Sequence, residues 1–217
     1  MEIDVLINSC ARPDVLDKSF STFKQKIKTS HKFRYVLLED VVENKERQRL
    51  GRQWIEEHND SFDDIVYADK RMGPGFFFAP IVSRCKSDYF FHLEDDNEFI
   101  VEIDTDPIFD LMRSDNNIVE IMLNRGPIRR ENNLGRIRLS GQELTKLGLF
   151  SVATGIFNTS HTKRIIEDIG WEERLNEFGS LTPTAEKFGL KRFVLGHGAQ
   201  HYKHVGEIKR YKKGGWK

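Results

Sequence analysis

The 217-residue chain is poor in cysteine, carries no net charge and contains no long apolar run. Its two cysteines, Cys10 and Cys85, stand far apart, which gives no paired spacing for a zinc site and favours free thiols. The 34 Lys and Arg residues balance 34 Asp and Glu residues, which argues against a nucleic-acid-binding protein. No apolar run approaches the roughly 20 residues of a membrane span, and Met1–Asp4 lack a basic signal-peptide region. We therefore expect a globular protein of the cytoplasm with no transmembrane segment.

The first half of the chain alternates between short apolar runs and amphipathic segments. We expect strands over residues 3–7, 33–38, 64–68, 89–93 and 118–123, and helices over 13–28, 44–57, 76–85 and 106–113. Such alternation is typical of βαβ units and predicts an α/β fold, with a mostly parallel central sheet flanked by helices. No repeat or linker interrupts the chain, so we expect a single domain over residues 1–217.

The pattern weakens after residue 123. We expect a hairpin or long loop over 124–141, where five arginines accumulate, and then a strand over 150–158 and a helix over 160–169. Residues 171–189 are expected to be irregular or short-helical, and 193–195 to form the last strand. The segment from Tyr202 to the end has six Lys or Arg residues against one Glu.

Polar side chains follow the expected strands where each strand ends, at residues 9–12, 39–40, 69–71 and 94–96. Ligands of an open parallel sheet bind beyond these carboxyl ends. Glu94, Asp95 and Asp96 come directly after a buried strand and repel one another, which a divalent cation such as Mg²⁺ or Mn²⁺ would relieve. A solvated acidic turn is the alternative interpretation.

Three further groups of residues are candidates for chemistry. Phosphate or metal binding is open to His197, His201 and His204. A set of basic residues could pair with phosphate groups: Arg12, Arg71, Arg84, Lys209, Arg210, Lys212 and Lys213. Four glutamates are candidates for a carboxylate that deprotonates an acceptor hydroxyl, and the sequence pattern does not choose among them: Glu172, Glu173, Glu177 and Glu186.

In their order, these motifs resemble those of nucleotide-sugar glycosyltransferases of the GT-A fold, especially glycosyltransferase family two. Ile7–Asp14 looks like the first strand and base-binding loop, and Leu37–Asp40 like the second strand end. Tyr89–Phe99 looks like the strand with a D-x-D-type metal motif, and His204–Gly206 like the closing His-x-Gly segment. The chain departs from the family where Glu39–Val42 replaces Asp-Asp-Gly-Ser, and where the acceptor-side Glu-Asp pair is missing.

The resemblance implies a role for each matching residue. Ser9, Arg12, Asp40 and Arg71 would hold the nucleotide, and Asp95 would contact its ribose or phosphate. Asp96 would bind Mn²⁺ or Mg²⁺, with His204 as a further ligand. Glu177, which lies about a dozen residues before Gly189, would be the catalytic base. Residues 1–123 would form a nucleotide-binding half, 124–206 an acceptor-side half and 207–217 a basic, mobile tail.

The function implied is metal-dependent transfer of a sugar, of the hexosyltransferase type, from a nucleoside-diphosphate sugar to a hydroxyl of a glycan or other acceptor. A carboxylate base would assist direct displacement, and UDP- or dTDP-linked donors would be favoured. Two alternatives stay open: a nucleotidyltransferase acting on sugar phosphates, and a non-catalytic nucleotide- or carbohydrate-binding module. The first would need a Gly-rich loop near the N-terminus, and residues 8–14 contain no glycine.

Overall fold

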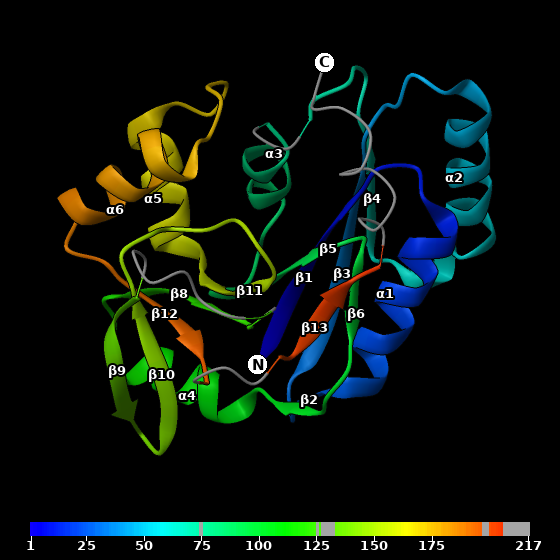
Figure 1. Ribbon diagram of the computed structural model, residues 1–217. Helices are drawn as coiled ribbons and strands as arrows, with labels where there is room; N and C mark the ends of the chain where they lie inside the picture. Colours follow the sequence, from blue (N-terminus) through cyan, green and yellow to red (C-terminus); the bar gives the residue numbers. More distant parts are fainter. Residues whose placement is uncertain (74–75, 125, 127–132, 197–199, 206–217) are drawn as a thin grey trace.

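The computed structural model describes residues 1–73, 76–124, 126, 133–196 and 200–205, and the whole chain is traced in Figure 1. Nine strands form the main sheet, in the order β4–β3–β1–β5–β11–β8–β12–β10–β9. Their bounds are β1 (Glu2–Ser9), β3 (Lys32–Glu39), β4 (Asp64–Tyr67), β5 (Tyr89–Glu94), β8 (Ile118–Met122), β9 (Asn133–Leu139), β10 (Gln142–Leu147), β11 (Gly155–Asn158) and β12 (Lys191–Leu195).

Most strands of this sheet run in the same direction. β4, β3, β1 and β5 pair in parallel, β11 and β10 run against them, and β8, β12 and β9 run with them. The strands β1 and β5 are buried on both faces, which is why they read as continuous apolar runs rather than as alternating ones. The predicted α/β fold with a mostly parallel central sheet is confirmed.

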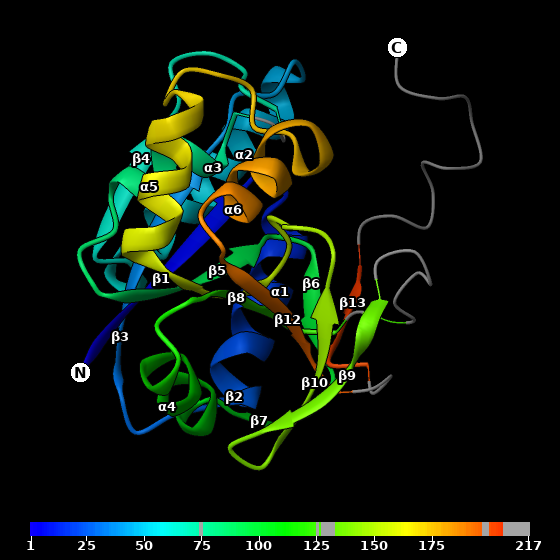
Figure 2. The same cartoon turned by 90° about the vertical axis from the view of Figure 1, so that its left-hand side faces the viewer.

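Helices cover both faces of the sheet (Figures 1 and 2). One apolar core includes buried residues of α1 (Pro13–Lys26), α2 (Lys45–Glu57) and α4 (Asp106–Ser114). The other includes buried residues of α3 (Phe78–Ser83), α5 (Thr159–Ile169) and α6 (Thr182–Lys187). Asn44 and Asn158 begin α2 and α5 by accepting a hydrogen bond from a backbone N–H three residues later.

Short elements complete the fold. η1 (Asn59–Ser61) is a 3₁₀ turn, and η3 (Glu177–Leu181) is a π-helical turn leading into α6. β2 (Ile27–Lys28) pairs with β7 (Ile103–Asp104), and β13 (Tyr202–His204) pairs with β6 (Asn97–Phe99). Among the described residues, none of the helices combines the length and the apolar character that crossing a bilayer requires.

Three details of the second half differ from the predictions. The strand expected over 150–158 begins only at Gly155, where a Cβ would lie 2.8 Å from the Cα of Met122, so close pairing of β11 with β8 requires glycine. The hairpin of β9 and β10 extends to Leu147, beyond the expected 124–141. The strand at 193–195 is not the last, because β13 follows it; three residues are too short for a recognisable period. The basic tail, 207–217, lies outside the described residues.

Candidate functional site

Two loops leave the sheet side by side at the carboxyl ends of β1 and β5. These strands are neighbours in parallel register, with Asn8 opposite Glu94, so residues 9–12 and 95–96 emerge together. The loops interlock through the backbone: the N–H of Asp95 donates to the carbonyl of Asn8 at 3.0 Å, and the N–H of Cys10 donates to Asp95 Oδ2 at 2.9 Å. The residues that follow β1 and β5 therefore lie together at this edge of the sheet.

Arg12 bridges the two adjacent aspartates. Its guanidinium pairs with both carboxylate oxygens of Asp95 and with Asp96 Oδ2, the latter at 3.1 Å. Burial would lower the pKa of Arg12, but the facing carboxylates hold it above its usual range, so the side chain stays charged. Burial raises the pKa of Asp95, against the opposing effect of Arg12. Arg12 therefore offsets part of the effect of burial on the pKa of Asp95.

The loop that carries Arg12 is held in an unusual conformation. Ala11 has a φ of 52°, which a residue with a Cβ seldom adopts. Arg47 of α2 donates from Nη2 to the carbonyl of Cys10 at 2.6 Å and from Nε to that of Ala11 at 2.8 Å. The helix thus fixes the turn from its outer side.

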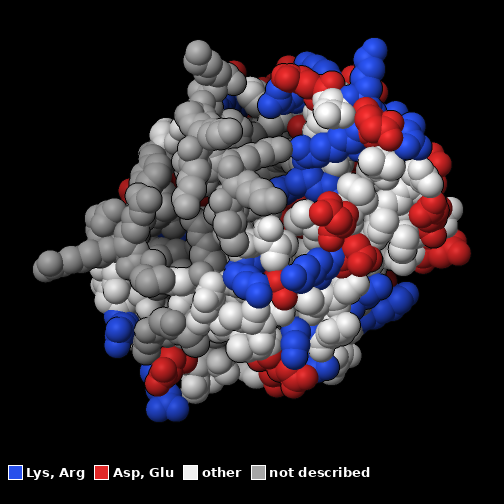
Figure 3. Space-filling model, turned by 45° about the vertical axis from the view of Figure 1, so that its right-hand side comes forward, with Lys and Arg blue, Asp and Glu red and all other residues white. Residues whose placement is uncertain are grey.

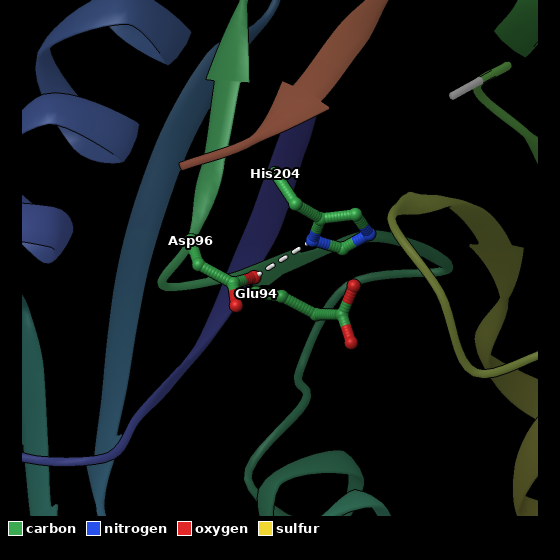
Figure 4. Close-up of side chains that lie close together, drawn as sticks. All are labelled: Glu94, Asp96 and His204. Atoms are coloured by element: carbon green, nitrogen blue, oxygen red, sulfur yellow. Dashed lines mark hydrogen bonds and ion pairs between the residues drawn. The ribbon is translucent and has the colours of Figure 1, made fainter. Parts of the chain in front are cut away.

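Glu94, Asp96 and His204 form a cluster in which one ligand atom of each residue lies within 4.8 Å of the others. Figure 4 shows these three side chains converging from β5, the turn after it and β13. His204 Nδ1 lies 3.1 Å from Asp96 Oδ1. Burial would raise the pKa of Asp96, but His204 and Arg12 together hold it below its usual range. Within the described part of the chain, no other three side chains of these types converge in this way.

The donor set of this cluster fits a divalent cation. Carboxylate oxygens favour Mg²⁺ or Mn²⁺, and an imidazole nitrogen adds a ligand that Mn²⁺ also accepts. The structure brings together the two predicted ligands, Asp96 and His204, and adds Glu94. The sequence held a signal for Glu94, because it stands two residues before Asp96 in the same acidic run.

His201 does not join this cluster. His201 is buried. Its ring Nδ1 accepts from the backbone N–H of Asn124 at 2.8 Å, and its backbone N–H donates to the carbonyl of Asn124 at 2.7 Å. Burial lowers the pKa of the ring, so it is neutral near pH 7. His201 thus fixes the approach to β13. His197, Lys209 and Arg210, which were also candidates, lie outside the described residues.

The ends of β3 and β4 hold the residues expected at the nucleobase. Asp40 is buried, and its carboxylate accepts the backbone N–H groups of Met72 at 2.8 Å and Gly73 at 3.2 Å. Asp40 therefore anchors the loop that contains Arg71. The side chain of Arg71 itself pairs with Glu43 and is 57% exposed.

Glu39, the residue before Asp40, lies beneath α2. It is 1% exposed, and Gln48 donates to its Oε1 at 3.2 Å. It faces Ser9, its register partner on β1, and the amide of Ala11; these contacts offset only part of the effect of burial, which raises the pKa of Glu39 to about 7. The predicted nucleotide residue Ser9 is thus buried behind the loop that carries Arg12.

The four glutamates proposed as a base differ in their surroundings. Glu172 and Glu173 are exposed, and Glu186 pairs with Arg192 while its side chain stays 59% exposed. Glu177, at the start of η3, is half-buried: its Oε1 accepts from Ser151 Oγ at 2.7 Å and from the Val152 N–H at 3.0 Å. Among these four, Glu177 has the most constrained carboxylate.

The segment 151–154 joins Glu177 to the metal-ligand cluster. Two residues after Val152, the hydroxyl of Thr154 contacts the side-chain amide of Asn97 and accepts from the Glu94 N–H at 3.4 Å. The Ala153 carbonyl faces His92 Nδ1 at 3.4 Å. Glu177 and Glu94 are therefore attached to opposite ends of one short segment.

Glu120 was not among the sequence candidates. It lies in the middle of β8 with no exposed surface and accepts from the Ser151 N–H at 3.2 Å. Burial raises its pKa well above the usual range. An acid flanked by Val119 and Ile121 in an apolar strand was the available signal.

Charged side chains of both signs are interspersed over the face shown in Figure 3, and no single-sign patch of described residues dominates it. This distribution matches the balanced composition. The described residues of that face therefore form no basic surface of the kind that nucleic-acid binding requires.

Comparison with known proteins identifies the fold. No protein-family profile matches the chain, and no curated protein resembles it in sequence. Among solved structures, Staphylococcus aureus TarS 1–349 matches 94% of this chain and 60% of its own, with a TM-score of 0.64 and 11% identity. The mannosyltransferase PcManGT from Pyrobaculum calidifontis, in complex with GDP-Man and Mn²⁺, matches 96% of this chain and 58% of its own, with a TM-score of 0.60 and 10% identity.

The same TarS fragment in complex with UDP matches with a TM-score of 0.62 and 10% identity, over 94% of this chain and 60% of its own. The chain thus spans about three fifths of the length of these matched chains. The likeness establishes the fold: this chain has the GT-A fold of nucleotide-sugar glycosyltransferases, as its motifs predicted.

Proposed function

We propose that the protein is a metal-dependent glycosyltransferase that moves a hexosyl group from a nucleoside-diphosphate sugar to an acceptor hydroxyl. The observation that carries this proposal is the cluster of Glu94, Asp96 and His204 at the carboxyl edge of a GT-A sheet, beside Arg12. Structures of similar fold are described in complex with UDP, with UDP-GlcNAc and with GDP-Man and Mn²⁺, which supports a nucleotide-sugar donor.

The donor side consists of the loops after β1, β3 and β5. Glu94, Asp96 and His204 would hold Mn²⁺ or Mg²⁺, which when bound neutralises the charge that develops on the departing diphosphate. Arg12 holds the Asp95 carboxyl group in place, where it is proposed to contact the ribose or phosphate. Asp40 and Arg71 are proposed to form the nucleotide side, with uridine or deoxythymidine as the base, while the buried Ser9 supports the loop of Arg12 from behind and is not proposed to contact the nucleotide.

On the acceptor side, Glu177 is proposed as the base. Its carboxylate is oriented by Ser151 and Val152 and would accept the proton of the attacking hydroxyl as the sugar is transferred. Direct displacement forms no covalent intermediate, so no Ser or Cys nucleophile is needed. The acceptor is proposed to be a glycan or another compound with a free hydroxyl.

Free Cys10 and Cys85 support a reducing compartment, and we propose the cytoplasm. We also propose the division into a nucleotide-binding half, residues 1–123, and an acceptor-side half, residues 124–206. Most of the proposed donor groups follow β1, β3, β4 and β5 and the proposed base lies in η3, whereas His204 of β13 reaches the donor side from the second half of the chain.

Incubation of the purified chain with UDP-, dTDP- and GDP-linked sugars, with Mn²⁺ or after chelation, tests the proposal. We expect Mn²⁺-dependent release of a nucleoside diphosphate, and faster release when an acceptor is present. Formation of a nucleoside triphosphate from a sugar nucleotide and pyrophosphate would instead indicate a nucleotidyltransferase. Nucleotide binding without turnover under any condition would indicate a binding module.

A further inference from the structure

Glu120 is a carboxyl group in a position where a carboxyl is costly. It lies in the centre of the sheet with no exposed surface, and its Oε1 has no hydrogen-bond partner among the described residues. Burial of an acid in apolar surroundings favours its neutral form, and burial raises the pKa of Glu120 well above its usual range. A leucine at this position would fit the apolar strand without that cost.

Glu120 belongs to a chain of contacts that leads to Glu177. The Ser151 N–H donates to Glu120 Oε2 at 3.2 Å, while the Ser151 hydroxyl donates to Glu177 Oε1 at 2.7 Å. One serine therefore connects the two carboxyl groups. The next residue, Val152, gives Glu177 its second hydrogen bond, at 3.0 Å.

The other side of Glu177 is attached to β12. The hydroxyl of Thr182 contacts the Glu177 carbonyl, and Arg192 Nη1 donates to the carbonyl of Thr182 at 3.3 Å. Arg192 is the register partner of Glu120 on the neighbouring strand. The contacts therefore form a nearly closed ring through Glu120, Ser151, Glu177, Thr182 and Arg192. Glu177 lies in the ring opposite the sheet.

The ring is open at one point. Glu120 Oε1 and Arg192 Nε are both buried and unpartnered, and the described residues form no ion pair between these two side chains. Two charged groups face Glu120: Arg192 of β12, which lowers its pKa, and Glu177 of η3, which raises it. Burial raises the pKa of Glu120 more than Arg192 lowers it. The contact that Glu120 makes is therefore the hydrogen bond that it accepts from the Ser151 N–H, and not an ion pair with Arg192.

The metal side of segment 151–154 has separate support. The Leu123 N–H donates to the Thr154 carbonyl at 3.0 Å, and Asn97 contacts the Thr154 hydroxyl. A change at Glu120 therefore acts first on Ser151 and Val152, and through them on Glu177, while Glu94 keeps its own contacts.

We propose that Glu120 is a positioning residue for Glu177: by accepting the Ser151 amide, it holds the Ser151–Val152 backbone on which the Glu177 carboxylate rests. This inference rests on the proposed function, because it takes Glu177 to be the group that accepts the acceptor's proton. It adds to that function a residue that touches neither donor nor acceptor.

Two substitutions of Glu120 separate positioning from simple stability. Glu120→Gln keeps an oxygen that accepts the Ser151 amide, and we expect kcat for sugar transfer within about threefold of wild type. Glu120→Leu removes the acceptor, and we expect kcat to fall roughly 100-fold, since misplacement of a reacting group by about 1 Å has an effect of that size. The KM for the donor sugar and the Kd for the nucleoside diphosphate with Mn²⁺ should stay within about twofold.

Thr162→Val is the matched control. It removes a fully buried hydroxyl that donates to the Asn158 carbonyl at 2.7 Å, on the same side of the sheet but outside the ring. We expect its kcat to match wild type. A Glu120→Leu variant with the kcat of this control would overturn the positioning role and leave the proposed function intact.

Ser151→Ala covers the case in which Glu120→Leu does not fold. This variant keeps the amide bonded to Glu120 and loses only the hydroxyl that contacts Glu177, and we expect a loss in kcat with the donor KM unchanged. An unaltered kcat in Ser151→Ala would contradict the inference. A wild-type chain that releases no nucleoside diphosphate from any donor would instead overturn the proposed function, and with it the role of Glu120.

Discussion

His204 Nδ1 lies 3.1 Å from Asp96 Oδ1, although 108 residues separate the two in the chain. The approach depends on β13, which pairs antiparallel with β6 and places His204 opposite Asn97. The Val205 N–H donates to the Asp96 carbonyl at 2.9 Å and closes this small sheet against the turn. A segment from the end of the described chain thereby completes the cluster that begins at Glu94.

Asp96→Asn tests the metal cluster. We expect Mn²⁺-dependent nucleotide binding to be lost and the fold to persist, because asparagine keeps an oxygen that can face His204 or Arg12, and Arg12 keeps its pairing with Asp95. Calorimetric titration of a nucleoside diphosphate with and without Mn²⁺ measures the effect. The control is Glu98→Gln, an acid of β6 that pairs with Lys18 and Lys203 outside the cluster.

His204→Ala should leave Asp96 and Glu94 as ligands and raise the Mn²⁺ concentration for half-maximal activity, by roughly 10- to 100-fold as for weakened metal sites generally. Wild-type Mn²⁺ dependence in both Asp96→Asn and His204→Ala would show that the metal lies elsewhere.

Asp40→Asn tests the nucleobase side. One carboxylate oxygen becomes an amide that faces the N–H groups of Met72 or Gly73, so the loop that carries Arg71 should loosen. We expect the Kd for UDP to rise about tenfold, a change of about 1.4 kcal/mol in binding free energy. The variant should also lose the preference for UDP over GDP. Asp63→Asn is the control, because Asp63 likewise accepts a backbone N–H, that of Tyr35 at 2.8 Å, but in the middle of β3 and away from the Arg71 loop. Tighter binding of GDP than of UDP by the wild-type chain would reverse the expected base preference.

Glu39 predicts a pH dependence of stability. Its pKa is raised to about 7 by burial, so between its unfolded value near 4.5 and pH 7 the folded state binds more protons than the unfolded state. Stability from this group is therefore present at low pH and is lost as pH rises toward 7, by up to about 3 kcal/mol. Urea unfolding at pH 5 and pH 8 should show a smaller loss in Glu39→Gln than in wild type. Glu57→Gln, an exposed acid of α2, should behave like wild type; equal losses in all three proteins would refute the assignment.

Gly51→Ala tests the contact between α2 and the loop of Arg12. A Cβ at Gly51 would lie 2.8 Å from the Cα of Ala11 and 2.9 Å from Glu39 Oε1, so the helix or the loop must shift. We expect a loss of about 1–3 kcal/mol in unfolding free energy and weaker nucleotide binding. Gly148→Ala is the control, since the nearest atoms to its Cβ would belong to the Leu134 side chain at 3.5 Å, an ordinary contact distance. A Gly51→Ala protein as stable as this control would mean that α2 does not press on the loop.

The sequence alone determined the elements whose apolar pattern is strong. The β1 and β5 runs are buried on both faces, and α1 has its apolar residues at helical spacing, so local pattern and final burial coincide. The place of the acidic run after β5 could be predicted in the same way, because polar residues directly after a buried strand lie at the edge of the sheet. The fold class, and the edge of the sheet at which the acidic run lies, therefore followed from the sequence.

The family resemblance named His204 as a further ligand, but only the tertiary structure places it, and other distant residues, beside the candidate site. β13 is three residues long and has no period of its own; its pairing with β6 is what brings His204 to Asp96. Glu120 and Ser151 are ordinary in sequence, and only the neighbouring positions of β8, η3 and the segment before β11 connect them to Glu177. Such contacts join residues that are far apart in the chain, and the local sequence pattern does not determine which distant residues come together when a loop closes.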